Sequence, residues 1–282
     1  MIIDAHAHVT GPMELYSYFR ALAGGSGAGV KLSPPEISDE ELEESLKDHL
    51  AEVGGVGTDL QLISPRPWAV PTGDRRESLV LHVTQQVNDM VARCVKLHPD
   101  RFAGVAALPQ PAGVGTKFCV EELERCVTEL GYFVTEEAVA AWGILRTPRC
   151  LQDFPDLKLV IGHGGGYVPY QVGRARAFRL AAMRNDPGLE SFDESMRRLY
   201  YDTVLYTQES VEYLIKVVGV DRCLFGTDKP ANGSVIDPET GRALNDIKPM
   251  IDAIPWLSEE DRSAIYEGNA RSAYGRLSNV GH

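Results

Sequence analysis

The chain has 282 residues, 44% of them hydrophobic and 24% charged, which is the composition of a soluble globular protein with a sizeable core. Its formal net charge of −12 argues against a nucleic-acid or membrane surface, because phosphate backbones need clustered Lys and Arg. No apolar run approaches the roughly 20 residues of a membrane span, and the N-terminus does not resemble a signal peptide. The five scattered cysteines form no C-x-x-C pair, so we expect a reduced, cytoplasmic protein without disulfides or a Cys-zinc site.

Short strand candidates alternate with helical stretches along the chain, which is the pattern of a parallel sheet with crossover helices. After the first strand, residues 10–57 are predicted to form a long helical insertion, and further helices are predicted over 78–97, 120–131 and 135–154. Seven segments are predicted to be strands or to begin one: 1–9, 58–65, 101–109, 131–133, 157–166, 199–206 and 222–230.

Two helix starts carry the signature of a capping box. Ser38 is followed three residues later by Glu41 within the insertion, and Ser258 is followed by Asp261 before the closing helix. In a capping box the serine side chain binds the backbone N–H of the third residue, which returns a bond to the serine N–H. We therefore expect helices to begin directly after Ser38 and Ser258.

The strand count is one short of a closed eight-stranded barrel. A βα unit with its return needs roughly 30 residues. Only residues 134–156 separate the fourth strand candidate from the fifth, and they hold one predicted helix and no strand. A barrel would therefore lack one strand and one helix at the Phe133–Val134 junction. Either the protein has a true deletion there, or an internal segment is missing from the sequence and its two flanks are joined.

The first strand ends in Asp4, His6 and His8, at alternate positions after an apolar start. Alternate residues of a strand point to the same side, so we expect the three side chains on one face. Two imidazoles two residues apart can reach the same cation. The alternative interpretation is a strand whose histidines are merely hydrogen-bonded. We interpret the run as a metal site.

Three other strand ends carry polar residues that a core would not need. His163 precedes three glycines, Asp228 lies near the end of the last strand, and Arg66 follows the second. The carboxyl ends of the strands in a parallel barrel meet at one rim, where active sites lie. Two imidazoles and a carboxylate suit Zn²⁺ or a similar divalent ion, so His6, His8 and Asp228 are candidate ligands.

Each of these residues has a catalytic or binding interpretation and, as an alternative, a purely structural one. A divalent ion would lower the pKa of its bound water to about 7, with Asp228 as ligand and proton acceptor and His163 moving a proton or polarising a carbonyl. Alternatively, Asp228 caps a helix and His163 is a turn residue. Arg66 and Arg174 are candidates for binding substrate carboxylates, because a guanidinium forms two parallel hydrogen bonds with a carboxylate. The alternative is that both are ordinary surface residues. We assign no role to the helical histidines His49, His82 and His98.

With these residues in place, the chain resembles the amidohydrolase superfamily. It is most similar to the branch of aminocarboxymuconate-semialdehyde decarboxylase, resorcylate-type decarboxylases and 4-oxalomesaconate hydratases. The segments DAHAH, HGGGYVPYQVGR, LFGTD and YEGNARSAY match that branch in order. The likeness to the hydratases spans nearly the whole chain and rests on SPRP at 64–67, ALPQPAGV at 107–114, VEELERCVTELG at 120–131, IDPETG at 236–241 and YEGNAR at 266–271.

The resemblance implies one α/β domain over residues 1–282, a distorted (β/α)8 TIM barrel of the metal-dependent hydrolase type with a helical insertion at about 10–57. It implies one divalent metal, Zn²⁺ or alternatively Mn²⁺, bound by His6, His8 and Asp228, with His163 catalytic. The family's third metal histidine lies on the fifth strand, and this chain has no histidine between His98 and His163. That absence coincides with the shortage at the 133/134 junction and favours a missing segment over a novel fold.

The resemblance also implies a lyase that hydrates a small unsaturated oxo-polycarboxylic acid of the 4-oxalomesaconate type, from aromatic ring-fission catabolism, with Arg66 and Arg174 holding its carboxylates. The hydratases carry Glu after the last strand, whereas this chain has Thr227-Asp228-Lys229, which is closer to the decarboxylases and hydrolases. The alternatives are therefore a decarboxylase of a hydroxybenzoate or muconate-semialdehyde acid, a hydrolase of an amide, lactone or phosphoester, or an inactive relative. We expect a homo-oligomer with a small carboxylated substrate and no nucleic-acid or membrane partner.

Overall fold

Seven strands lie in the part of the chain that the computed structural model describes, which comprises residues 1–9, 11–24, 34–66, 70, 75–113, 117–132, 134–135 and 148–279. All neighbouring strands pair in parallel, in two sheets of order β1-β2-β3-β4 and β5-β6-β7. The strands are β1 (Ile3–Val9), β2 (Leu60–Pro65), β3 (Phe102–Ala106), β4 (Val134–Thr135), β5 (Leu159–Ile161), β6 (Leu199–Asp202) and β7 (Cys223–Leu224).

The two sheets are joined along β1. The backbone N–H of Ala5 donates to the carbonyl of Phe225 at 2.8 Å, and Ala7 forms a parallel bridge with Lys229. The strand order is therefore β4-β3-β2-β1-β7-β6-β5, with the first and last strands of the chain side by side, as a parallel barrel requires. Within the described residues, β4 and β5 are the two edges of this order.

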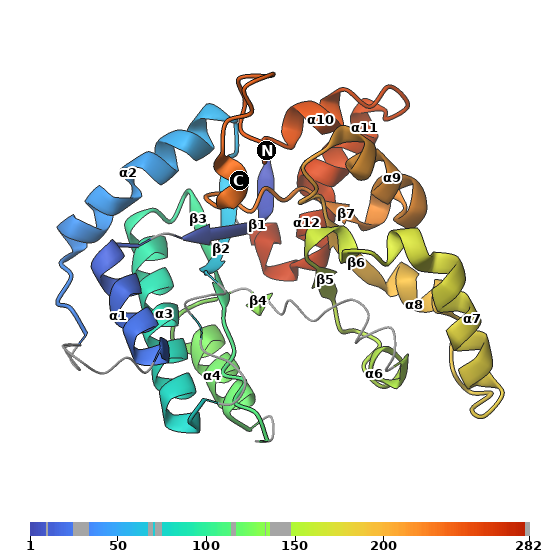
Figure 1. Ribbon diagram of the computed structural model, residues 1–282, viewed down its shortest axis with the longest axis horizontal. Helices are drawn as coiled ribbons and strands as arrows, with labels where there is room; N and C mark the ends of the chain where they lie inside the picture. The colour runs from blue at the N-terminus through green and yellow to red at the C-terminus, as the bar shows by residue number, and fades with distance from the viewer. Residues whose placement is uncertain are drawn as a thin grey trace.

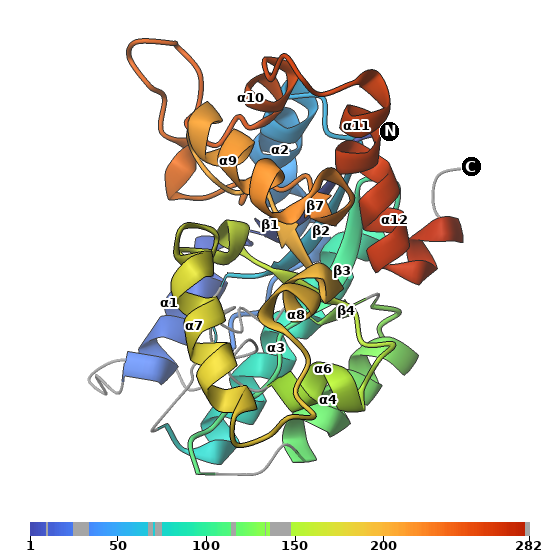
Figure 2. The ribbon, with the colours of Figure 1, turned by 90° about the vertical axis from the view of Figure 1, so that its right-hand side faces the viewer.

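The helices lie outside the strands in two groups. In Figure 1, α1, α3 and α4 lie beside β1 to β4, and α7, α8 and α9 lie beside β5 to β7. Figures 1 and 2 both place α2 and α10 at one end of the molecule and α4 and α6 at the other. None of the described helices has the length and apolar character that a membrane span needs. The bounds are α1 Met13–Gly24, α2 Asp39–Gly55, α3 Glu77–Leu97, α4 Lys117–Thr128, α6 Pro148–Asp153, α7 Val172–Met183, α8 Phe192–Arg198, α9 Gln208–Val218, α10 Lys248–Asp252, α11 Glu259–Ser263 and α12 Asn269–Ala273.

Apolar packing explains why the two helical groups stay on the strands. One buried cluster joins α1 to α4 with β1 to β3, and a second joins α8, α9 and α10 with β5 to β7. A third packs Ala270 and Tyr274, at the end of the chain, against Ile3 and Leu224. Because Ile3 lies at the start of β1, this third cluster covers the strand ends opposite to those that carry the polar residues. Each fully buried Leu, Ile or Phe contributes roughly 1.5–3 kcal/mol of burial free energy.

The fourth strand begins later than the sequence indicates. The sequence predicts a strand from 131–133 and none in 134–156, but Val134 and Thr135 pair with β3. Gly131, with φ of 72°, turns the chain after α4, and Tyr132 is buried before the pairing begins. Phe133 and residues 136–147 lie outside the described residues, so the segment expected to be missing at the Phe133–Val134 junction stays a prediction.

Both predicted capping boxes are present. Ser38 precedes α2 and Ser258 precedes α11, and in each case the serine oxygen accepts the third residue's N–H while that residue's carboxylate accepts the serine N–H. The insertion predicted over 10–57 contains α1 and α2. Local side-chain chemistry therefore sets where these helices begin.

Candidate metal centre

Three potential metal ligands meet where β1 passes the segment after β7. His8 Nε2 lies 3.1 Å from Asp228 Oδ1, and His6 Nε2 lies 4.0 Å from the same oxygen. One ligand atom from each of the three residues lies within 4.8 Å of the other two. The structure thus brings together His6, His8 and Asp228, the residues that the sequence analysis names as ligands. Two imidazole nitrogens and a carboxylate oxygen facing one another fit a divalent ion such as Zn²⁺ or Mn²⁺.

Both histidines also form a hydrogen bond through their other ring nitrogen, Nδ1. His6 Nδ1 lies 2.6 Å from Asp202 Oδ2, and His8 Nδ1 lies 2.9 Å from the Ser64 hydroxyl. A carboxylate oxygen accepts the hydrogen bond, so Nδ1 of His6 is the donor toward Asp202 and Nε2 is the ring nitrogen that faces the other ligands. Metal-binding histidines usually have such an outer partner, which fixes the ring orientation. The arrangement therefore suits two Nε2 ligands.

Asp202 is a site residue that the sequence analysis missed. It ends β6, is 1% exposed, and also accepts the backbone N–H groups of Gly164 at 3.2 Å and Val204 at 3.1 Å. A Cβ at Gly226 would lie 3.1 Å from the Asp202 Cβ and 3.2 Å from the His6 Cβ, so the absent side chain lets β6, β7 and β1 approach closely. The feature of the sequence that could have identified Asp202 is an acidic residue at the end of the apolar stretch LYYD.

The backbone at Asp228 adopts a conformation that is uncommon for a residue with a side chain. Asp228 has φ of 58°, and among the described residues only His163, at 53°, shares a positive φ without being glycine. Such conformations cost free energy and cluster at functional sites. The backbone N–H of Asp228 donates to the His6 carbonyl at 2.7 Å, which helps to hold the turn in place.

The carboxylate of Asp228 has two separate environments. Its Oδ1 faces the histidines, while Oδ2 accepts a 3.1 Å hydrogen bond from the Tyr206 hydroxyl. Burial alone would raise the pKa of Asp228, but the hydrogen bond from His8 and the nearby His6 outweigh it and lower that pKa below its ordinary value. Burial and the neighbouring Asp228 raise the pKa of Tyr206, so the phenol keeps the proton that it donates. Asp228 is therefore ionised, as a ligand must be.

His163 lies beside the centre and is exposed to solvent. Its ring centroid is 5.0 Å from that of His6, in an edge-to-face arrangement. The predicted strand over 157–166 is shorter in the structure, because β5 ends at Ile161 and His163–Gly165 forms a 3-10 turn. His163 is outside the group of three ligands, at a position from which it can meet a bound molecule.

Asp4 does not join the metal centre, so the expected grouping of all three β1 side chains is wrong. Its fully buried carboxylate accepts hydrogen bonds from Thr227 Oγ1 at 2.5 Å, Gln61 Nε2 at 2.9 Å and the Thr227 N–H at 3.0 Å. Burial raises the pKa of Asp4, and these bonds oppose the rise. The pairing of β1 with β2 shifts register between Asp4 and Ala7, and the Asp4 carboxylate accepts the backbone N–H of His6 at 3.2 Å without joining the three candidate ligands.

The two arginines predicted as carboxylate clamps lie on different elements. Arg66 directly follows β2 and is partly buried. Arg174 is on the exposed side of α7, with its guanidinium carbon 5.5 Å from the Phe178 ring centroid. Neither belongs to the group of three ligands, and their role in binding a substrate stays a prediction.

A protein-family model described as amidohydrolase matches residues 133–276. A 2-keto-4-carboxy-3-hexenedioate hydratase from Sphingobium sp. (strain NBRC 103272 / SYK-6) is 30% identical over 336 residues, which cover 98% of this chain and 97% of that protein. The chain belongs to the amidohydrolase family. This amidohydrolase also matches the crystal structure of a 4-oxalomesaconate hydratase from Rhodopseudomonas palustris, with a TM-score of 0.81, 31% identity and coverage of 99% of this chain and 97% of that one.

A more distant solved structure supports the fold. A dihydroxybenzoic acid decarboxylase from Polaromonas sp., with bound manganese and an inhibitor, has a TM-score of 0.71, 19% identity and coverage of 99% of this amidohydrolase and 97% of that chain. The expected superfamily and the likeness to hydratase enzymes are thereby confirmed, as is an α/β fold with parallel sheets of the amidohydrolase type.

Proposed function

We propose that this amidohydrolase is a metal-dependent hydro-lyase that adds water to a small unsaturated oxo-polycarboxylic acid of the 4-oxalomesaconate type. The observation that carries the proposal is the meeting of His6, His8 and Asp228 within 4.8 Å, in a chain that matches two hydratases over nearly its whole length. A divalent ion held there, Zn²⁺ or Mn²⁺, would supply Lewis acidity toward water or a substrate oxygen.

The side chains around the centre suit the proton transfers of a hydration. Addition of water forms one C–O bond and one C–H bond across a carbon–carbon double bond, so one proton must leave the water and one must reach the neighbouring carbon. Asp228 is ionised and accepts the proton from water, while Tyr206 steadies its second oxygen. His163, exposed beside His6, delivers the proton to carbon.

The proposed substrate class comes from the likeness to the two hydratases, and it requires cationic side chains near the site. A polycarboxylate needs cationic partners in a protein with a net charge of −12, and Arg66 and Arg174 are the candidates for paired contacts with its carboxylates. Replacing either arginine with Gln is expected to raise KM more than it lowers kcat, because a clamp acts on the bound ground state as well as on the transition state.

Loss of the conjugated double bond gives a direct assay. The protein loaded with Zn²⁺ or Mn²⁺ is expected to remove the ultraviolet absorbance of a 4-oxalomesaconate-type acid. A His6→Ala/His8→Ala double variant, prepared in the same way, controls for contaminating enzymes. Full metal loading of the wild-type protein with unchanged absorbance would contradict the proposed hydration.

Decarboxylation is the second candidate, favoured by the aspartate of Thr227-Asp228-Lys229 at the centre. In that reaction a carboxylate leaves as CO₂ and a proton takes its place on carbon, so His163 would again deliver a proton. Release of CO₂ from a dihydroxybenzoate or a muconate-semialdehyde acid, with no hydration activity, would select this alternative.

We also propose that the barrel of this chain lacks one βα unit at the 133/134 junction, directly before β4. Two observations support it: β4 and β5 are the edges of the described strand order, and 336 aligned positions exceed the 282 residues of this chain. A crystal structure with β4 hydrogen-bonded directly to β5 would contradict the proposal. The intact mass of the protein from its natural source, compared with 30.9 kDa, separates a true deletion from a segment left out.

A further inference from the structure

The side chain of Lys229, which directly follows Asp228, is buried together with its charge. Lys229 is 1% exposed, and its Nζ lies 2.8 Å from Glu52 Oε1 on α2. The Ser234 hydroxyl donates to the same carboxylate oxygen at 2.8 Å. Removing an ammonium group from water is strongly unfavourable unless a partner of opposite charge compensates it. Lys229 can therefore stay buried only while Glu52 remains in reach.

The backbone of Lys229 connects this ion pair to the candidate ligands. Its N–H donates to Thr227 Oγ1 at 3.1 Å, and its carbonyl accepts the His8 N–H at 3.1 Å. The side chain thus extends to α2 while the main chain lies against the strand that carries both histidines. Any shift of Lys229 away from α2 would also move Asp228, its neighbour in the chain.

We propose that the Lys229–Glu52 pair is a positioning device, which holds the Asp228 turn against α2 and so sets where the metal-binding carboxylate lies. The inference rests on the proposed metal site. Asp228 keeps φ of 58°, a conformation that is unfavourable for a residue with a side chain and persists only where its surroundings enforce it. The ion pair provides that constraint on the C-terminal side of Asp228.

A second chain of contacts from α2 reaches the N-terminal side of the same turn. His49, three residues before Glu52, places Nε2 2.7 Å from Gln61 Oε1, and Gln61 donates to Asp4. Asp4 in turn accepts both the side-chain and the backbone donors of Thr227. Helix α2 therefore holds both neighbours of Asp228, which gives the helical insertion a role at the metal centre.

A double variant can test the pair without leaving a buried charge unpaired. In Lys229→Met/Glu52→Gln both charges are removed and both side chains keep their approximate length. The dissociation constant for Zn²⁺, measured by competition with a chromogenic chelator, is expected to rise about tenfold or more, as for other losses of an outer-shell partner. The melting temperature of the metal-free protein reports separately on folding.

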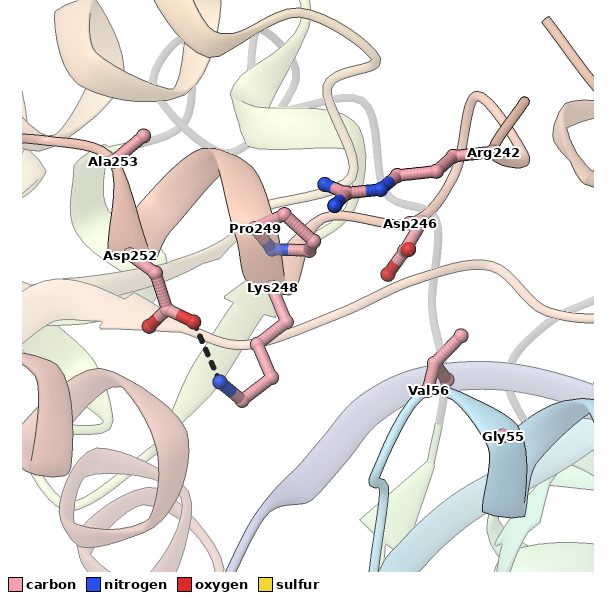
Figure 3. Close-up of a pocket in the computed structure, with 8 residues that line it drawn as sticks. All are labelled: Gly55, Val56, Arg242, Asp246, Lys248, Pro249, Asp252 and Ala253. Carbon is pink, nitrogen blue, oxygen red and sulfur yellow. Dashed lines mark hydrogen bonds and ion pairs between the residues drawn. The ribbon is translucent and has the colours of Figure 1, made fainter. Parts of the chain in front are cut away.

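The matched control removes a similar pair from the surface. Lys248 and Asp252 on α10 form an ion pair, with Nζ 2.5 Å from Oδ2 (Figure 3). The pair lies beside a pocket of about 570 Å³ that the end of α2 also lines. Lys248→Met/Asp252→Asn is expected to leave the Zn²⁺ dissociation constant within about twofold of the wild type, because exposed pairs contribute little.

Each outcome decides between the two proposals. Wild-type protein that binds no Zn²⁺ or Mn²⁺ would overturn the metal site and this inference together. A wild type that binds, with a folded double variant of unchanged affinity, would overturn the inference alone, as would an equal loss in the surface control. If the double variant does not fold, Glu52→Asp, which keeps the charge and shortens the side chain, is expected to weaken Zn²⁺ binding measurably, and unchanged affinity there would also overturn the inference.

Discussion

Asp202 Oδ2 lies 2.6 Å from His6 Nδ1, although 196 residues separate the two in sequence. The contact joins the end of β6 to β1 across β7, and the same carboxylate accepts the N–H of Gly164 in the turn of His163. One buried acid therefore orients a candidate ligand and the turn of the candidate proton donor.

Asp202→Asn is expected to weaken Zn²⁺ or Mn²⁺ binding by about 10–100-fold, because an amide replaces the anion that fixes the His6 ring. The amide NH₂ would face either the N–H donors of Gly164 and Val204 or Nδ1 of His6, and in each orientation one of the present hydrogen bonds is lost. Chelator competition measures the change. Asp193→Asn, at an exposed carboxylate paired with Arg176, is the control. Equal affinity of the Asp202 variant and the wild type would contradict the positioning role.

Removal of the metal is expected to abolish turnover reversibly. Dialysis against a chelator should stop the reaction, and added Zn²⁺ or Mn²⁺ should restore it. The reason is that the bound ion is expected to activate the water or the substrate, while the three ligands only hold the ion. His8→Ala should not regain activity at metal concentrations that restore the wild type. His82→Ala, at an exposed histidine on α3, should behave as wild type. Full activity of the dialysed protein would argue against metal dependence.

The buried carboxylate of Glu122 predicts a pH-dependent stability. Burial would raise its pKa, but the hydrogen bonds from Arg125 and Asn88, each at 2.7 Å, outweigh burial and lower the pKa. A lowered folded-state pKa stabilises the protein above the unfolded value of about 4.3, and this contribution is lost as the pH falls through the folded pKa.

Glu122→Gln is accordingly expected to lower the free energy of unfolding by about 1–3 kcal/mol at pH 7. The difference from wild type should shrink as the pH falls below about 4.3 and through the lowered folded-state pKa of Glu122. Urea titrations at several pH values measure it, with the exposed Glu121→Gln as control. A difference that stays constant down to pH 3 would show that the carboxylate charge is not the cause.

The cap at Ser258 gives a local prediction. Ser258 Oγ accepts the Asp261 N–H at 3.0 Å, and Asp261 Oδ2 accepts the Ser258 N–H at 2.9 Å. Ser258→Ala should cost about 1 kcal/mol, which is roughly 2–4 °C in melting temperature for a chain longer than 150 residues. Ser263→Ala, exposed in the same helix, should change little. Equal melting temperatures for both variants would show that the cap contributes nothing.

The amino-acid sequence by itself determined the features that depend on near neighbours. The Asp-x-His-x-His run places His6 and His8 two residues apart on a strand, and a period of two keeps such residues on one side. The capping boxes need only residues three apart. Asp228 and His163 were found because polar residues at the carboxyl ends of parallel strands converge on one rim.

Only the tertiary structure decided which polar residues share that rim and which lie behind it. Asp4 is adjacent to the histidines in sequence, but a register shift turns it to Thr227 and Gln61. The Asp202 contact with His6 and the Glu52 contact with Lys229 span 196 and 177 residues. Sequence patterns carry no information on such distances, because the partner of a buried charge depends on how strands and helices pack, and that packing depends on the whole apolar core.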